Sequence, residues 1–270
     1  MNRAAHSRQS DSQYGKSKIQ ILKTAEMLMA TKGVYATSLR EINQEANQKN
    51  ASSVHYHFKD REGLIRAVLE SHIAKVERQR TLMLQSIKSD YPILDSGDVS
   101  TLSEIEKSKI IRRLINILIG PSAEKLHSQS GRNYLKILQE IVFSGKTDVG
   151  GAKTPQTFDD LINFTKGIRT ATGYILKLAP EFPGTIVIMR GKIIARMIIS
   201  ALADLIPEID SSGQIYETSS EVDLNRDLSN NKENINLDLV IENLTDVILA
   251  IISSPVSELT LTAVRNSGLD

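Results

Sequence analysis

Apolar residues recur three or four positions apart along most of this chain, which is the spacing of one face of an α-helix. Residues 18–32 show this spacing, and Gly33 follows them as a natural helix end. The same spacing predicts a long helix from about Arg61 to Lys88. No segment of any length alternates with the period of a β-strand, so the pattern predicts an all-α fold.

More helices are predicted beyond residue 92. Their expected bounds are about 103–119, 132–143, 155–164, 167–178, 185–205 and 237–253. Gly120-Pro121 is expected to end the first of these helices. The segments 92–102, 144–155 and 208–236 are predicted to be loops, and the last is acidic and expected to be mobile.

Two short helices around a tight turn are predicted within residues 37–67. Ser38 and Glu41 have the spacing of a capping box, which satisfies two backbone donors at a helix start. The turn follows at 47–50, where asparagine suits a left-handed backbone. A second short helix is expected from Ala51 to His57, and Asp60 can cap the next helix. This arrangement is a helix-turn-helix, whose second helix enters the major groove of DNA.

The second short helix and its flanks carry side chains that can reach phosphates or base edges. Our candidate DNA-binding residues are Ser38, Arg40, Lys49, Asn50, Ala51, Ser52, Ser53, His55, Tyr56, His57, Lys59 and Arg61. The three flanking cations among them, Lys49, Lys59 and Arg61, would neutralise phosphates. Without the wider pattern, the same helix could be a polar surface helix that has no partner. Phe58 is predicted to be a core residue, and Tyr56 fits either role.

Residues 18–70 resemble the TetR/AcrR family of bacterial transcription regulators. The matching motifs are I-L-K-T-A-E-M-L at 21–28, Gly33, Thr37-Ser38, Ile42, V-H-Y-H-F at 54–58 and D-R-E-G-L at 60–64. The chain departs from the family pattern at His55, where tyrosine is usual, and in a turn that is one residue longer than the commonest one. The resemblance implies a DNA-binding dimer with a ligand cavity in its helical body.

Charge is distributed unevenly along the chain. Residues 1–66 hold eleven Lys/Arg against six Asp/Glu, which gives +5, whereas residues 204–246 hold two against eleven, which gives −9. This asymmetry favours an oriented approach to a polyanion, although segments also vary in charge by chance. The cysteine count is 0, which fits a reducing cytoplasm. Cations interrupt the most apolar stretch, 186–206, and the polar N-terminus lacks a signal core, so no membrane partner is expected.

Helices 185–205 and 237–253 are apolar over most of their circumference and need cover on several sides. Paired across a twofold axis, they would form a four-helix dimer interface. Its expected residues are Ile194, Ile198, Leu202, Val240, Leu244, Val247 and Ile251.

No cofactor, metal site or catalytic site is predicted. His55 and His57 lie two residues apart, so on a helix they point in different directions. No nucleotide-binding, hydrolase or metalloprotease motif is present, so no enzyme is expected. Ligand-binding residues remain unassigned, and five polar side chains are candidates for lining a cavity. These are Arg112, Arg113, His127, Tyr134 and Tyr174.

The expected domain organisation is a disordered basic arm, a DNA-binding domain, a regulatory and dimerisation domain, and a tail. Their bounds are 1–16, 17–66, 67–255 and 256–270. The predicted function is a cytoplasmic, homodimeric repressor that binds a palindromic double-stranded operator and is released by a small-molecule effector. The alternative is a dimeric helical binding module that no ligand switches.

Overall fold

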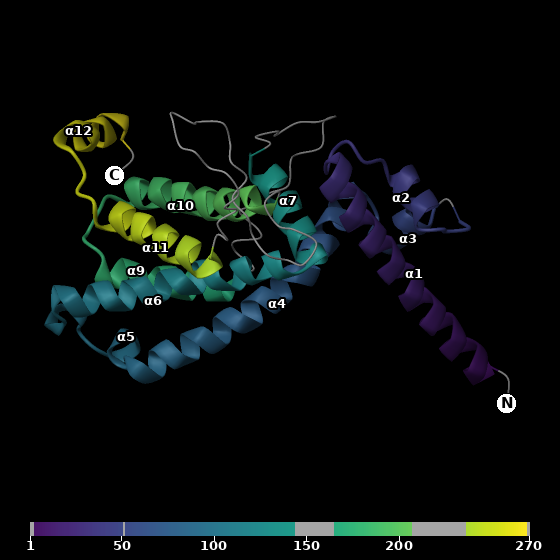
Figure 1. The fold of residues 1–270 in the computed structure, drawn as a ribbon, viewed down its shortest axis with the longest axis horizontal. Coiled ribbons are helices and arrows are strands. Elements are labelled where there is room, and N and C mark those ends of the chain that lie inside the picture. Colours follow the sequence, from purple (N-terminus) through teal and green to yellow (C-terminus); the bar gives the residue numbers. More distant parts are fainter. Residues whose placement is uncertain (1–2, 51, 144–164, 207–235, 269–270) are drawn as a thin grey trace, which may run out of the picture. The chain divides into compact units, whose positions relative to one another are not determined.

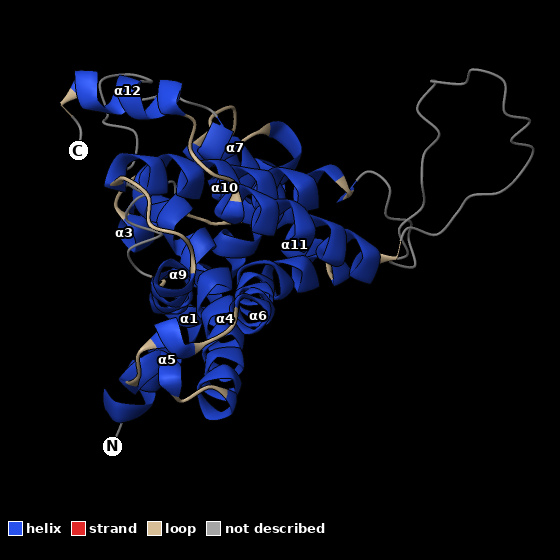
Figure 2. Ribbon diagram, turned by 90° about the vertical axis from the view of Figure 1, so that its left-hand side faces the viewer, coloured by secondary structure: helices blue, strands red, loops and turns tan. Residues whose placement is uncertain are grey.

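The computed structural model describes residues 3–50, 52–143, 165–206 and 236–268, and every regular element in these ranges is a helix (Figure 2). The all-α prediction is confirmed for this part of the chain. Ala51, the helix predicted over 155–164 and the loops predicted over 144–155 and 208–236 lie outside the described residues, apart from Asn236.

The chain forms two compact units. The head unit comprises Met1–Lys75 and Ser128–Leu161, and the body unit comprises Val76–His127 and Ile162–Asp270. The described helices of the head unit are α1 (Arg3–Lys32), α2 (Leu39–Glu45), α3 (Ser53–Phe58), α7 (Gln129–Phe143) and the first part of α4 (Arg61–Asp90). Within it, α1 packs against α7 and α2, and α2 packs against α3 (Figure 1).

Helix α6 (Glu104–Ala123) is central to the body unit, where it packs against α9 (Lys166–Leu178), α10 (Gly184–Asp204) and α11 (Leu237–Ser253) (Figure 1). Its residues Ile110, Leu114 and Ile115 are fully buried. The described part of the unit also contains the second part of α4 and four short elements, which are α5 (Ile93–Ser96), the 3-10 turns Val99–Thr101 and Glu124–His127, and α12 (Glu258–Ser267).

Three predicted boundaries outside the helix-turn-helix are wrong. Helix α1 begins at Arg3 rather than near Lys18, within the segment expected to be a disordered arm. No proline occurs in this segment, and the helix can propagate from residues that the core already holds, since adding a residue is easier than starting a helix. The tail expected over 256–270 contains α12, whose start Ser257 caps by accepting from the Thr260 amide.

The third wrong boundary is the end of α6, which continues through Pro121 to Ala123. A proline inside a helix has no N–H to donate to the carbonyl four residues earlier, which here belongs to Ile117. Arg80 of α4 replaces this donor, because its Nε lies 3.3 Å from the Ile117 carbonyl oxygen. Its Nη2 also donates to the Leu118 carbonyl, at 3.2 Å. A side chain from another helix therefore satisfies the backbone at the proline.

A largely buried hydrogen bond joins α1 to α4 inside the head unit. His72 Nε2 lies 2.9 Å from Glu26 Oε2, and the His72 ring stacks on Tyr134 of α7 with centroids 4.7 Å apart. Burial is the largest influence on Glu26 and raises its pKa. Hydrogen bonds from His72, Ser130 and Asn133, with the attraction of His72, outweigh burial and leave the pKa of Glu26 below its ordinary value.

This lowered pKa predicts acid sensitivity. Since the pKa of Glu26 is lower in the folded chain, its stabilisation is complete above its ordinary value of 4.5 and is lost as pH falls through the folded value. The difference in unfolding free energy between the natural chain and Glu26→Gln should therefore shrink from pH 7 to pH 3 in urea titrations. Glu70→Gln, at an exposed position of α4, is the control and should show no such trend. A constant difference for Glu26→Gln would contradict this explanation.

No single described helix is long and apolar enough to cross a membrane. Among the described helices, α11 and α12 reach that length and apolar composition only as a pair, which is bent by 66° at the junction.

Candidate nucleic-acid interface

The predicted capping box starts α2. Ser38 Oγ accepts from the Glu41 amide at 3.1 Å, and the Glu41 carboxylate accepts from the Ser38 amide at 3.5 Å. Ile42 is fully buried and holds α2 against the unit's core. The Ser38 side chain is thus engaged at the helix start, while Arg40 in the first turn of α2 is exposed.

The turn between α2 and α3 is built by asparagine side chains and carbonyls. Asn47 adopts the predicted left-handed backbone, with φ of 51°. The Asn50 carbonyl accepts from Asn43 Nδ2 at 3.0 Å and from Ser53 Oγ at 2.8 Å. Asn50 Oδ1 accepts from the Ser52 amide at 2.9 Å. These bonds hold the chain in a turn up to Ser52, so α3 begins at Ser53, two residues later than predicted.

Helix α3 has a buried side and an exposed side. Val54 and Phe58 point into the head unit, as their 2% and 6% exposure shows. His55 is exposed, and Tyr56 is 73% exposed. Tyr56 therefore takes the surface role that the sequence left open, and Phe58 is confirmed as a core residue.

His57 is half-buried, between the two sides of α3. Burial, and then the charge of Lys18, lower the pKa of His57 below its ordinary value of 6.5. The imidazole is therefore neutral near pH 7, with one donor and one acceptor nitrogen.

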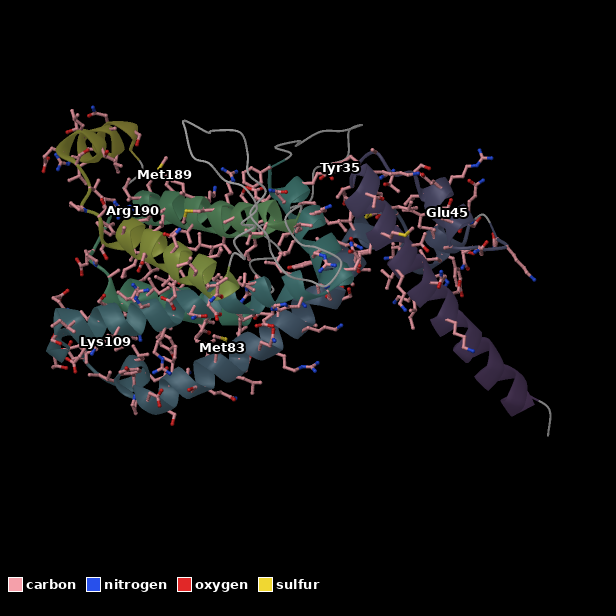
Figure 3. All side chains as sticks on the ribbon, viewed as in Figure 1. Tyr35, Glu45, Met83, Lys109, Met189 and Arg190 are labelled. Carbon is pink, nitrogen blue, oxygen red and sulfur yellow. The ribbon has the colours of Figure 1, made fainter. Side chains whose placement is uncertain are left out.

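Three lysine side chains lie near α3. Lys49 and Lys59 are exposed on its two flanks, and Lys59 ends the helix with φ of 69°. Lys18 of α1 lies with its Nζ 5.9 Å from the centre of the Phe58 ring. In the sequence, Lys18 is only one of several cations in the basic N-terminal segment. The structure places it beside α3, which the sequence did not indicate. Glu45 of α2, labelled in Figure 3, is an exposed acid of the same helix pair.

Arg61 differs from the other predicted phosphate contacts. Its Nη1 donates to the Val34 carbonyl at 3.0 Å and to the Thr37 carbonyl at 2.5 Å. The guanidinium therefore binds the loop between α1 and α2, an intramolecular role that the sequence did not indicate.

The five side chains considered for a ligand cavity mostly engage other residues of their own unit. Arg112 pairs with Glu242 at 2.9 Å and with Asp246, both on α11. Arg113 pairs with Asp90 at 2.7 Å. Tyr174 donates to Asp95, Tyr134 stacks on His72, and His127 is exposed. These contacts give four of the five side chains a structural explanation, and no described contact marks a ligand site.

The predicted dimer residues divide into two groups. Ile198, Leu202 and Leu244 are buried within one chain, with exposures of 7%, 0% and 7%. Ile194, Val240 and Ile251 are half-buried, and Val247 is 41% exposed. The large apolar side chains that one chain leaves most exposed on these helices are others. They are Ile188, Met189 and Ile193 of α10, and Leu239 of α11 (Figure 3 labels Met189).

Within the described ranges, no three His, Asp or Glu side chains gather closely enough to hold a metal ion. The prediction of a metal-free chain otherwise stays a prediction.

A capped helix, a tight asparagine turn and a second helix with an exposed polar side define a helix-turn-helix DNA-binding protein. The profile of the family "Bacterial regulatory proteins, tetR family" matches residues 21–68. Residues 21–68 therefore belong to the tetR family, and the chain carries the DNA-binding domain of a transcriptional regulator.

One solved structure similar to this chain is a protein from Mesorhizobium loti MAFF303099 assigned to the TetR-family transcriptional regulators. The two chains are 16% identical, the match covers 88% of this chain and 97% of the other, and the TM-score is 0.42. This distant likeness adds nothing to the assignment. The comparison with curated proteins finds no match.

Proposed function

We propose that this chain is a dimeric, sequence-specific repressor that acts in the cytoplasm and places α3 of each copy in the major groove of a palindromic operator. The observation that carries this proposal is the exposed pair His55 and Tyr56 on a helix anchored from behind by Val54 and Phe58. A side chain on such a rigid helix can read base edges, while Lys49 and Lys59 on its flanks bind phosphates.

Two substitutions separate base reading from phosphate binding. Lys59→Ala should weaken binding to all duplexes alike and reduce the slope of affinity against salt by about one. His55→Ala should cost about 1–3 kcal/mol at one operator position and relax the preference there. Fluorescence anisotropy on operator and scrambled duplexes, over a range of salt, measures both effects. Equal losses on both duplexes for His55→Ala would contradict base reading by this side chain.

The dimer contact is proposed for the exposed apolar residues of α10 and α11. Ile188, Met189, Ile193 and Leu239 are between 55% and 66% exposed, so one chain leaves them facing water. A second copy related by a twofold axis would cover them with the same surface. Such a dimer would fix the spacing of its two α3 helices at about one turn of DNA.

Release by a small molecule is the final part of the proposal. An effector that prefers another body conformation would shift α4, and the two α3 helices would no longer fit successive grooves. The engaged polar side chains of the body, such as Arg112 and Tyr174, instead favour the alternative of an unswitched module. A thermal-shift screen followed by a DNA-release assay decides between them, since a module would bind its hits without changing DNA affinity.

A further inference from the structure

Charged side chains bind both backbone polar groups of Val34, its N–H and its C=O, which belong to two successive peptide groups. Glu140 of α7 accepts from the Val34 amide, with Oε2 2.8 Å from the nitrogen. Arg61 of α4 donates to the Val34 carbonyl at 3.0 Å. Hydrogen bonds to charged groups are stronger than neutral ones, so the two successive peptide groups that meet at Val34 are both fixed.

Val34 lies in the short loop that joins α1 to α2. The loop starts at Gly33, whose φ of 101° suits glycine. At its far end, Thr37 is fully buried, and its Oγ1 donates to the Leu28 and Gly33 carbonyls at 3.2 and 2.9 Å. Arg61 also binds the Thr37 carbonyl. Because α2 starts two residues after Thr37 and packs on α3, the conformation of this loop sets the direction of both helices.

Glu140 lies outside the segment that matches the tetR profile, 106 residues from Val34 in the chain. Helix α7 nevertheless packs on α1 within the head unit. Asn133 and Tyr134, nearer its start, contact Glu26 and His72. The head unit thus contains a third supporting helix that the family match does not include.

We propose that Glu140 and Arg61 are positioning residues for operator recognition, which hold α2 and α3 in the orientation that reads DNA. This inference rests on the proposed function, because it concerns how the helix pair is aimed at an operator. It assigns Arg61 to the loop rather than to a phosphate, and it makes α7 part of the DNA-reading unit.

The Glu140 charge by itself and the positioning role predict opposite effects of removing this side chain on operator binding. The head carries a net positive charge, and removing an acid from it should tighten binding to every DNA sequence. The positioning role predicts that Glu140→Ala instead weakens operator binding, by about tenfold, the factor that corresponds to 1.4 kcal/mol. Binding to scrambled duplex should stay the same or tighten, because the phosphate contacts remain.

Two variants complete the Glu140 series. Glu140→Gln keeps an acceptor oxygen for the Val34 amide and should retain most of the operator affinity. Glu70→Ala removes the same charge from an exposed position of α4 and should not weaken operator binding. If Glu140→Ala binds the operator as tightly as Glu70→Ala does, or loses scrambled duplex equally, the positioning role is wrong.

Arg61 has a different diagnostic. A phosphate contact would be rescued by Arg61→Lys and would lower the salt slope by about one in Arg61→Ala. A positioning residue leaves that slope unchanged, and lysine rescues it poorly, because its ammonium ends one atom short of Nη1, the nitrogen that donates to both carbonyls. A lowered slope with rescue by lysine would return Arg61 to the phosphate role.

A measurement without DNA tests the positioning role of Glu140 separately from the proposed function. Amide hydrogen exchange of the natural chain should show protection at Val34, and Glu140→Ala should remove it while α6 stays protected. If the natural chain binds no operator, the proposed function fails. The exchange result alone still decides whether Glu140 holds the Val34 amide. An unprotected Val34 amide in the natural chain would show that Glu140 does not hold it.

Discussion

Arg80→Ala should destabilise the chain by about 3 kcal/mol, because it leaves a largely buried carboxylate without its cation. Arg80 is 5% exposed, and its Nη1 lies 2.9 Å from Glu77 Oε1. Its other nitrogens donate to carbonyls near the α6 proline and to Ser122 Oγ at 3.2 Å. The substitution therefore removes both the cation that pairs with Glu77 and the donor to the α6 carbonyls near Pro121.

Glu77 extends this network to α9. Its Oε2 accepts from the Gly167 amide at 2.7 Å, next to the start of that helix. A side chain at Gly167 would lie 2.9 Å from Arg80 Cβ, so the glycine allows the close approach. Arg80 and Glu77 thus hold α4, α6 and α9 together inside the body unit.

Thermal unfolding measures the effect of Arg80→Ala. For a chain of this size, about 3 kcal/mol corresponds to a fall in Tm of about 6–12 °C. Arg78→Ala removes the same charge from an exposed position of α4 and should change Tm little. Adding Glu77→Gln to Arg80→Ala should restore part of the loss, because it removes the unpaired charge. Equal Tm values for the Arg78 and Arg80 variants would show that the network does not stabilise the body.

Ile193→Asp should split the proposed dimer and lower operator affinity by about 100-fold or more, the avidity that a second linked site adds. Ile193 is 55% exposed on α10, so one chain alone tolerates a carboxylate there. In a twofold contact the same carboxylate would meet its own copy, unpaired and out of water. Met189→Asp, at a neighbouring exposed position, should act in the same direction.

Light scattering at micromolar concentration, together with operator binding, reads out this prediction. Ile105→Asp is the matched control, because Ile105 is 70% exposed on α6, outside the proposed surface. It should leave both the mass and the affinity unchanged. A natural chain that is monomeric would refute the dimer, and an Ile193 variant that stays dimeric would place the contact elsewhere.

Local sequence features correctly predicted the start of α2 and the turn that follows it. Ser38 and Glu41 lie three residues apart, and Asn47 lies where a left-handed backbone is needed, so both features depend only on near neighbours. The start of α3 shifted because Asn50 and Ser53 bond to each other, a detail that helical spacing does not contain.

Contacts between distant segments could not be predicted. The Glu140 bond to Val34 spans 106 residues, and nothing in either local sequence indicates it. The continuation of α6 through Pro121 depends on Arg80, which is provided by another helix. On α10, apolar residues cover most of the helix circumference, so the pattern could not show that Leu202 is covered while Ile193 is exposed.

Selection from random duplex DNA tests sequence-specific recognition by α3 most directly. The full chain, in excess and shown to be folded, should enrich sites with two inverted half-sites whose centres lie about one helical turn apart. Binding to these sites should weaken steeply as salt rises, since Lys49 and Lys59 release counterions from phosphates. Enrichment of no common motif under these conditions would contradict the account.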